Sequence, residues 1–256
     1  MPQLEQLWVE NHDRGLHIFH IESQGASEEQ VREFCEERGV TFPQTLRSGS
    51  DFSALPGGSG LPYAYVIGVD GKVLWQGRNG YKNVIHQELQ KVRYPGLGRS
   101  DVSKPAHKAA VEFVKKKYAK AIALANKLVD DEDAAVAADA KHIIARSEQK
   151  GESLLARAER QAKNRDYLDA KLTYTLVKKG FKGLAPAETA ETKLDEIKKD
   201  KSIQREIKAA ATLAGLEQSL ARKNGDTRRA TFTAFAKKFE GTKAAEKAEK
   251  LAARAR

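Results

Sequence analysis

Cys35 is the only cysteine in this chain of 256 residues. A single cysteine can form neither an intrachain disulfide nor a cysteine metal cluster. A cysteine attacks as its thiolate, which forms readily only where a nearby cation or a helix N-terminus lowers the thiol pKa. Cys35 instead follows Val31 and Phe34 on the apolar stripe of an expected helix. We therefore interpret Cys35 as a small core residue, and a one-cysteine peroxidase that uses this thiol stays a further hypothesis.

Two histidines lie close together in the expected strand 16–21. A metal site needs ligands that converge on one side. Because side chains alternate along a strand, the odd separation of His17 and His20 puts them on opposite faces. We expect both to be ordinary strand residues, and we predict no metal and no other cofactor.

The stretch from Gly60 to Gly80 reads GLPYAYVIGVDGKVLWQGRNG and predicts a β-hairpin. Its strands, 63–69 and 73–76, are rich in β-branched and aromatic residues, and Asp70-Gly71 favours a two-residue turn. Gly60, Leu61 and Pro62 form its entrance. Proline removes one ladder donor there, and the bond before a proline is where a cis peptide is tolerated. A plain edge-strand proline explains the same residues, so spacing alone leaves both interpretations open.

Gly-Leu-Pro, an apolar strand, Val-Asp-Gly-Lys-Val and a closing glycine before a helix together resemble the C-terminal half of a thioredoxin-like domain of the TlpA type. This group has relatives among the redoxins and peroxiredoxins. The resemblance runs from about Pro2 to Val92. It implies an α/β thioredoxin-like fold and a thiol-disulfide oxidoreductase. It also implies that the backbone at Leu61 and Pro62 pairs with a protein disulfide substrate or a redox partner.

The chain departs from that family because it has no Cys-x-x-Cys motif. Disulfide exchange needs an attacking thiolate and a second thiol that resolves the mixed disulfide. Residues 1–7, MPQLEQL, resemble the tail of the segment that follows the second cysteine in the family. We expect a chain truncated before the first strand, since losing that strand leaves a sheet edge uncovered, and a redox-dead remnant is the alternative. No catalytic residue is named, and this form is expected to lack disulfide reductase activity.

Localisation depends on the same question. The sequence has no apolar run of the roughly 20 residues that span a bilayer, and its first residues lack the basic patch and apolar core of a signal peptide. As written, the sequence predicts a cytoplasmic protein without a transmembrane segment. A signal sequence upstream would instead place the protein in the periplasm, where relatives of the TlpA type work.

Other local signals predict the helices and strands of the first part of the chain. A short amphipathic helix opens it, and Ser27 with Gln30 forms a capping box for a helix that ends before Gly39. Strands are expected over 16–21 and 40–46, and a helix follows the hairpin. The order helix, strand, helix, strand, hairpin, helix predicts one mixed sheet with a crossover, which is the thioredoxin topology without its first strand.

Composition divides the chain into two domains. Residues 1–100 carry 10 Lys and Arg against 12 Asp and Glu, whereas residues 101–256 carry 35 against 23. The second part is rich in Ala, Lys, Glu and Leu, which is typical of amphipathic helices. We predict the thioredoxin-like domain over 1–98, a linker over 99–105 and an all-α helical repeat domain over 106–256.

The repeat is visible in the sequence. Phe181, Gly183, Ala187-Glu188 and Ala190-Glu191 recur 58 residues later at Phe239, Gly241, Ala245-Glu246 and Ala248-Glu249. Asn164-Arg165-Asp166 and Leu172-Thr173 match Asn224-Gly225-Asp226 and Phe232-Thr233, 60 residues on, and a weaker copy begins at Lys117. Each unit predicts a helix, a turn at Phe-x-Gly and an Ala-rich helix. The pattern resembles tetratricopeptide-like arrays, with a longer period than the usual 34 residues.

Two functions remain open from the sequence. The first is a TlpA- or redoxin-type oxidoreductase whose helical repeats dock a protein partner. The second is a non-catalytic interaction protein, in which a degenerate thioredoxin fold and the repeats both bind partners. We do not expect nucleic-acid binding, because the lysines are mixed with glutamates and the sequence has no recognised nucleic-acid motif or aromatic stacking patch.

Overall fold

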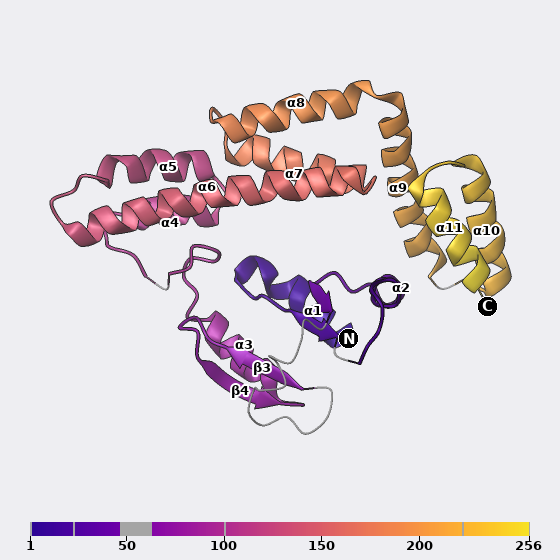
Figure 1. The fold of residues 1–256 in the computed structure, drawn as a ribbon, viewed down its shortest axis with the longest axis horizontal. Coiled ribbons are helices and arrows are strands. Elements are labelled where there is room, and N and C mark those ends of the chain that lie inside the picture. Colours follow the sequence, from indigo (N-terminus) through magenta and orange to yellow (C-terminus); the bar gives the residue numbers. More distant parts are fainter. Residues whose placement is uncertain (1, 23, 47–62, 100, 222, 256) are drawn as a thin grey trace. The chain divides into compact units, whose positions relative to one another are not determined.

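The computed structural model describes residues 2–22, 24–46, 63–99, 101–221 and 223–255. The chain divides into two compact units, Met1–Val114 and Lys115–Arg256, and each is considered by itself. Most of the described residues are helical, and the strands all lie in the first unit (Figure 1). Among the described helices, none is long and apolar enough to cross a lipid bilayer.

The first unit opens with a helix that precedes a strand, helix, strand arrangement. These elements are α1 (Pro2–Asn11), the 3-10 helix η1 (His12–Arg14), β1 (His20–Glu22), α2 (Glu28–Arg38) and β2 (Gln44–Leu46). β1 and β2 pair in parallel, with His20 opposite Gln44, so α2 is the crossover between them.

The predicted ends of α2 are confirmed. The Ser27 hydroxyl accepts a hydrogen bond from the Gln30 N–H at 3.2 Å, and the Gln30 side chain accepts one from the Ser27 N–H at 2.8 Å. Gly39 ends the helix with a left-handed backbone, φ +61°. A capping box and a terminal glycine therefore fixed this helix locally.

Both expected strands are shorter than the sequence suggests. The strand expected over 16–21 is paired only at His20–Glu22. The strand expected over 40–46 begins at Gln44 and not at residue 40. Pro43 explains the late start of β2, because it has no N–H to donate. Its carbonyl still accepts a hydrogen bond from the His20 N–H at 3.1 Å.

The predicted hairpin forms from β3 (Ala64–Ile67) and β4 (Val73–Gly77), and the helix α3 (Tyr81–Leu89) follows it. The prediction of a two-residue turn is wrong. Gly68 and Lys72 close a three-residue loop, with the Gly68 N–H donating to the Lys72 carbonyl at 2.9 Å. The Gly71 N–H donates to the Gly68 carbonyl at 3.0 Å, and Gly71 has φ +80°. A loop of this length uses the glycine as its left-handed third residue.

The prediction of one mixed sheet is also wrong for the described residues. β1 pairs with β2 and β3 pairs with β4, giving two separate two-stranded sheets, so no thioredoxin fold is shown. No described strand lies between the two pairs. The hairpin is instead held by a small apolar core that joins α1, β3 and α3, formed by Leu7, Val66, Ile85 and Leu89.

The stretch expected to be a linker, 99–105, lies inside the first unit, ahead of α4 (His107–Val114). The residues on both sides of it are packed, since Leu97 and Ala106 have no exposed surface. The Tyr94 hydroxyl lies 2.7 Å from Nδ1 of His107. These contacts tie α4 to the chain that follows α3.

The second unit contains helices and no strand within its described residues. Its elements are α5 (Tyr118–Ala125), the 3-10 helix η3 (Asn126–Leu128), α6 (Ala134–Lys163), α7 (Tyr167–Gly180), α8 (Ala185–Lys199), α9 (Lys201–Leu220), α10 (Gly225–Lys238) and α11 (Lys243–Arg254). α7 packs on α6 and α8, and α10 packs on α11 (Figure 1). Two helical hairpins, α7–α8 and α10–α11, therefore occupy the predicted repeats, and the helical nature of this region is confirmed.

The register of the repeat differs from the sequence match in its first half. α7 and α10 are both 14 residues long, and both end one residue before the repeated phenylalanine, so an offset of 58 residues holds throughout. Buried Tyr174 then corresponds to buried Phe232, whereas Leu172, which the sequence matched to Phe232, is 61% exposed. The match of Asn164-Arg165-Asp166 to Asn224-Gly225-Asp226 is wrong for the same reason, because burial follows the helix ends and not the shared letters.

Candidate functional site

Cys35 lies on α2, and its side chain is half-buried. Val31 and Phe34 are half-buried as well, so the expected fully buried stripe is only partly covered. Burial raises the pKa of the Cys35 thiol, and the nearby carboxylate of Glu5 raises this pKa further. An activated thiol needs the opposite shift. The environment of Cys35 therefore disfavours the thiolate and does not support a one-cysteine peroxidase.

The predicted partner-binding loop, Gly60, Leu61 and Pro62, lies outside the described residues. The structure describes the opposite end of the hairpin, at the loop between β3 and β4. The Val69 N–H donates to Oε1 of Glu88 at 3.1 Å, and Lys91 binds the other oxygen at 2.5 Å. Hydrogen bonds from Lys91 and Val69 lower the pKa of Glu88, so its carboxylate stays charged and fixes the turn to α3.

The two histidines do not converge. Nδ1 of His20 lies 2.6 Å from Oε1 of Gln44 across the β1–β2 pair, and the His17 ring stacks with Phe19 at 6.5 Å between ring centroids. Among the residues that the structure describes, no group of three or more His, Cys, Asp or Glu side chains is placed to hold a metal ion.

The most extensive polar constellation lies in the second unit and was not predicted as a site. Its centre is Arg165, in the short connection between α6 and α7. Arg165 has φ +62°, a left-handed conformation that L residues other than Asn and Asp seldom adopt. Such a backbone persists only where the surroundings hold it, and the contacts of the Arg165 side chain do so here.

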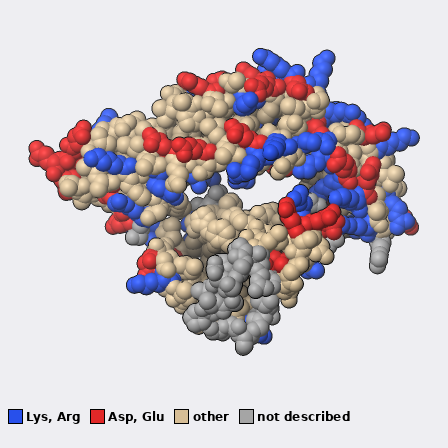
Figure 2. Space-filling model, in the orientation of Figure 1, with Lys and Arg blue, Asp and Glu red and all other residues tan. Residues whose placement is uncertain are grey.

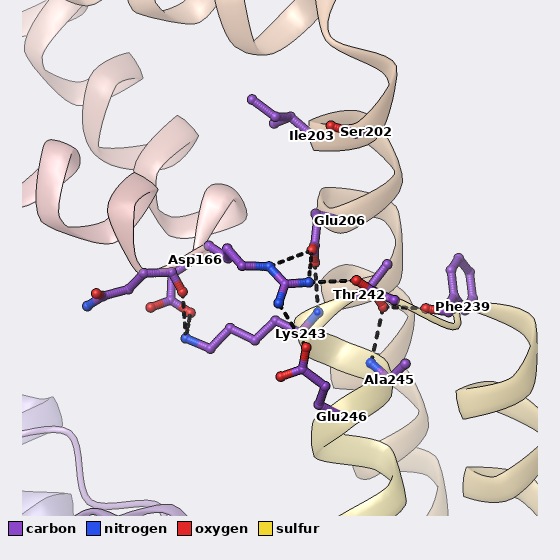
Figure 3. A network of polar contacts seen from close by, with 12 residues as sticks. Asp166, Ser202, Ile203, Glu206, Phe239, Thr242, Lys243, Ala245 and Glu246 are labelled. Atoms are coloured by element: carbon purple, nitrogen blue, oxygen red, sulfur yellow. Dashed lines mark hydrogen bonds and ion pairs between the residues drawn. The ribbon is translucent and has the colours of Figure 1, made fainter.

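The guanidinium of Arg165 reaches two other elements, at Glu206 and Glu246, which are labelled in Figure 3. Nε and Nη2 donate to Oε1 of Glu206 on α9, at 3.0 and 2.5 Å. Nη1 donates to Oε1 of Glu246 on α11 at 2.8 Å, and Nη2 also donates to the carbonyl of Gly241 at 2.7 Å. One side chain thus joins the entry of the first hairpin to α9 and to the turn of the second hairpin.

Lys243 makes the reciprocal connection (Figure 3). Its ammonium donates to Oδ1 of Asp166 at 2.5 Å and to the carbonyl of Asn164 at 3.0 Å. Its backbone N–H donates to Oε2 of Glu206 at 3.0 Å, so both oxygens of this carboxylate are bound. The Glu206 side chain is only 12% exposed, which strengthens its ion pair relative to one on an open surface.

The chemistry of this network is structural. Hydrogen bonds that Arg165 donates to Glu206 and Glu246 raise the pKa of Arg165, which makes its proton still harder to remove. The residues that bind Arg165 and Lys243 include no thiol and no imidazole. The nearby Thr242 hydroxyl donates to the Phe239 carbonyl at 2.7 Å (Figure 3), and the Ser202 hydroxyl donates to Oδ1 of Asp200 at 2.7 Å. The constellation therefore fits a clamp between helices and not a reaction centre.

Sequence reasoning noted Arg165 and Asp166 only as members of a repeat. Glu206 and Glu246 lie 41 and 81 residues away in the chain, so no local spacing connects them with Arg165. The sole local sign was an arginine in a short turn flanked by Asn164 and Asp166.

Comparisons with protein-family models, with curated proteins and with solved structures each found no match to this chain.

Proposed function

We propose that this chain is a non-catalytic, protein-binding scaffold whose second unit is a tetratricopeptide-like array of helical hairpins. The observation that carries this proposal is the repetition of one hairpin at α7–α8 and α10–α11 with the same buried alanines. Ala187 and Ala190 correspond to Ala245 and Ala248, and all four are buried. Stacked hairpins of this kind present extended surfaces, which such proteins use to bind other proteins.

The first unit supports a non-catalytic role. The chain has one thiol, and disulfide exchange by the family mechanism uses two. The pKa of that thiol is raised by burial and by Glu5, so little thiolate is available near neutral pH.

The likeness to a thioredoxin-like domain belongs to this proposal as well. A parallel strand, helix, strand unit, then a hairpin, then a helix is the order that the TlpA resemblance implies for 1–98. We propose that this part is the C-terminal portion of such a domain. On this proposal the loop of Gly60, Leu61 and Pro62 binds a partner backbone. A thiol-disulfide oxidoreductase is the second candidate, favoured by the same element order, and it would need a thiol besides Cys35.

An insulin reduction assay separates the two candidates. We expect the intact chain with dithiothreitol to reduce insulin no faster than dithiothreitol alone. A rate typical of thioredoxins, lost in the Cys35→Ser variant, would overturn the non-catalytic proposal.

The reactivity of the thiol is a second test. We expect iodoacetamide at pH 8 to label native Cys35 more slowly than the urea-unfolded chain. The cause is the raised pKa, which leaves a smaller fraction of the folded thiol ionised than of the unfolded thiol at this pH. A Glu5→Gln variant removes one cause of the raised pKa and should label faster. Native labelling as fast as that of the unfolded chain would contradict this account.

Binding itself is tested by site-specific photocrosslinking in the native host. A photoreactive residue at Leu172, which is 61% exposed on the array, should give a discrete protein adduct that mass spectrometry identifies. A matched residue at Val9, 58% exposed on the first unit, reports on that unit separately. The same photoreactive residue is also placed at Lys171 and Lys208. If none of these three array positions gives a protein adduct, the scaffold proposal is contradicted.

A further inference from the structure

One face of α9 carries a row of basic side chains. Lys201, Arg205 and Lys208 are spaced by four and three residues, so they lie on the same side of the helix, and all three are exposed. The opposite side of α9 bears buried Leu213 and the nearly buried Glu206 of the Arg165 network. The row is therefore the outward face of this helix.

The C-terminal end of α10 extends the same basic surface. Nη2 of Arg205 donates to the carbonyl of Lys238 at 3.4 Å, which places this end of α10 beside the row. Lys237 and Lys238 are both exposed there. We call the surface formed by Lys201, Arg205, Lys208, Lys237 and Lys238 the α9–α10 basic surface. Figure 2 shows basic side chains over this part of the second unit, with some acidic ones among them.

Internal pairing leaves this surface with uncompensated charge. Residues 201–256 contain 14 Lys and Arg but only six Asp and Glu. Three of these six acids are engaged by other side chains, since Glu206 and Glu246 bind Arg165 and Glu217 binds Lys247 at 2.8 Å. Within the described residues, Lys201, Lys208 and Lys237 have no carboxylate within ion-pair distance. The positive potential of this surface therefore remains available to an anionic partner.

We propose that the α9–α10 basic surface docks a short acidic segment of a partner protein. The inference rests on the scaffold function proposed above and adds the chemistry of the partner. Carboxylates of such a segment would complement the row on α9, because opposite charges across an interface steer encounter and fix register. The row is also bounded. Asp200 precedes it, and Glu240 follows Lys237 and Lys238, so the attractive potential covers a limited length.

The same features argue against a nucleic acid. A long phosphate backbone would extend past the row onto Asp200 and Glu240. Single-stranded nucleic acids also need aromatic side chains on which bases can stack. Among the described residues of the second unit, the aromatic side chains are buried or half-buried, and those nearest the basic surface, Phe232, Phe235 and Phe239, are buried.

A binding titration with three ligands tests the proposal. The first is a fluorescent peptide of twelve glutamates, measured by anisotropy with the intact chain at 50 mM salt. We expect saturable binding that the variant K201Q/R205Q/K208Q weakens about tenfold, because each exposed ion pair contributes little but three are lost. A matched control, K127Q/K141Q/K171Q, removes the same charge from exposed positions outside α9–α11 and should change affinity less than twofold.

Three results would overturn the proposal. They are no saturable binding of the peptide, equal weakening by the two triple variants, and tighter binding of a DNA duplex of equal charge at the same surface. The last result would assign the surface to nucleic acid. Circular dichroism of both variants checks that the helices are intact. If crosslinking at Leu172 captures a partner equally with K201Q/R205Q/K208Q, the scaffold function stands and the acidic docking at α9 fails.

Discussion

The two helical hairpins of the second unit share one turn. Phe181 and Phe239 follow the first helix of each hairpin with nearly equal backbone angles, φ −113° and ψ 25° against φ −110° and ψ 25°. Two residues later, Gly183 and Gly241 both have φ +82°. The phenylalanine N–H donates at 3.0 Å to the carbonyl four residues earlier in both cases. The Phe-x-Gly sequence therefore specifies this turn locally, independently of what surrounds it.

The hairpins differ at the entry to their first helix and near its end. α10 begins with an ordinary cap, in which Oδ1 of Asn224 accepts a hydrogen bond from the Thr227 N–H at 2.9 Å. The entry to α7 uses Arg165 and the clamp that holds it. Gly180, just before the first turn, lies against a neighbouring segment, whereas its counterpart Lys238 is exposed. The turns are thus fixed by local sequence, whereas the entry to α7 depends on tertiary contacts and the entry to α10 on a local cap.

The largest expected effect tests the register of this comparison. Tyr174→Ala and Phe232→Ala should each destabilise the chain by about 3–5 kcal/mol, because each removes a large buried ring from a helix interface. Leu172→Ala should cost less than about 0.5 kcal/mol, because its side chain is 61% exposed. Urea unfolding followed by helical circular dichroism measures all three. If Leu172→Ala lowers the free energy of unfolding strongly and Tyr174→Ala only slightly, the 60-residue register is correct.

A second effect tests the difference just before the turns. A Cβ atom at Gly180 would lie 2.8 Å from the carbonyl oxygen of Lys116 and 3.0 Å from the Tyr118 ring. Gly180→Ala should therefore destabilise the second unit by about 1–3 kcal/mol through overpacking, despite the better helix propensity of alanine. The matched change in the other hairpin, Lys238→Ala, should stay within about 0.5 kcal/mol. Equal costs for the two variants in urea unfolding would remove the distinction.

The third effect concerns the clamp. Arg165→Ala keeps an L residue at positive φ but removes every side-chain hydrogen bond, leaving the nearly buried Glu206 with only the Lys243 N–H. We expect a loss of about 1–2 kcal/mol, discounted because the Arg165 side chain is 40% exposed. Hydrogen exchange of α9 and α11 should increase together.

Arg165→Gly is the control that separates the ion pairs from the backbone. Glycine adopts positive φ without steric cost, so this variant should be about 1 kcal/mol more stable than Arg165→Ala. The cost of losing the ion pairs should also shrink at high salt. If Arg165→Ala leaves both stability and exchange unchanged, the network does not clamp the hairpins.

The same contrast explains what the sequence could and could not predict. Signals confined to a few residues were read correctly, such as the capping box at Ser27, the glycine end of α2 and the Phe-x-Gly turns. The length of the hairpin loop was missed by one residue, because Gly71 serves equally well in a two-residue or a three-residue loop. The pairing between strands that are distant in sequence was predicted wrongly. One mixed sheet was expected, and the described strands form two separate sheets.

The candidate sites show the same division. The helix stripe predicted a core position for Cys35, but the side chain is only half-buried, and this partial burial raises the pKa of its thiol. The Arg165 clamp could not be found, because its carboxylates come from helices 41 and 81 residues further on. The first half of the repeat was aligned by two residues too many, because the match depended on shared Asn and Asp residues. These residues are common at helix starts and turns in general, so they do not fix a register.

The smallest expected effect tests whether the two turns are really equivalent. Gly183 and Gly241 both have φ +82°, and a Cβ atom at either position would meet nothing within 4 Å. Alanine there carries only backbone strain, so Gly183→Ala and Gly241→Ala should each cost about 1 kcal/mol, with asparagine costing less. Their difference in urea unfolding should be below about 0.5 kcal/mol. Since Gly241 also gives its carbonyl to Arg165, a clearly larger cost at Gly241 would show that the clamp, and not the local sequence alone, holds the second turn.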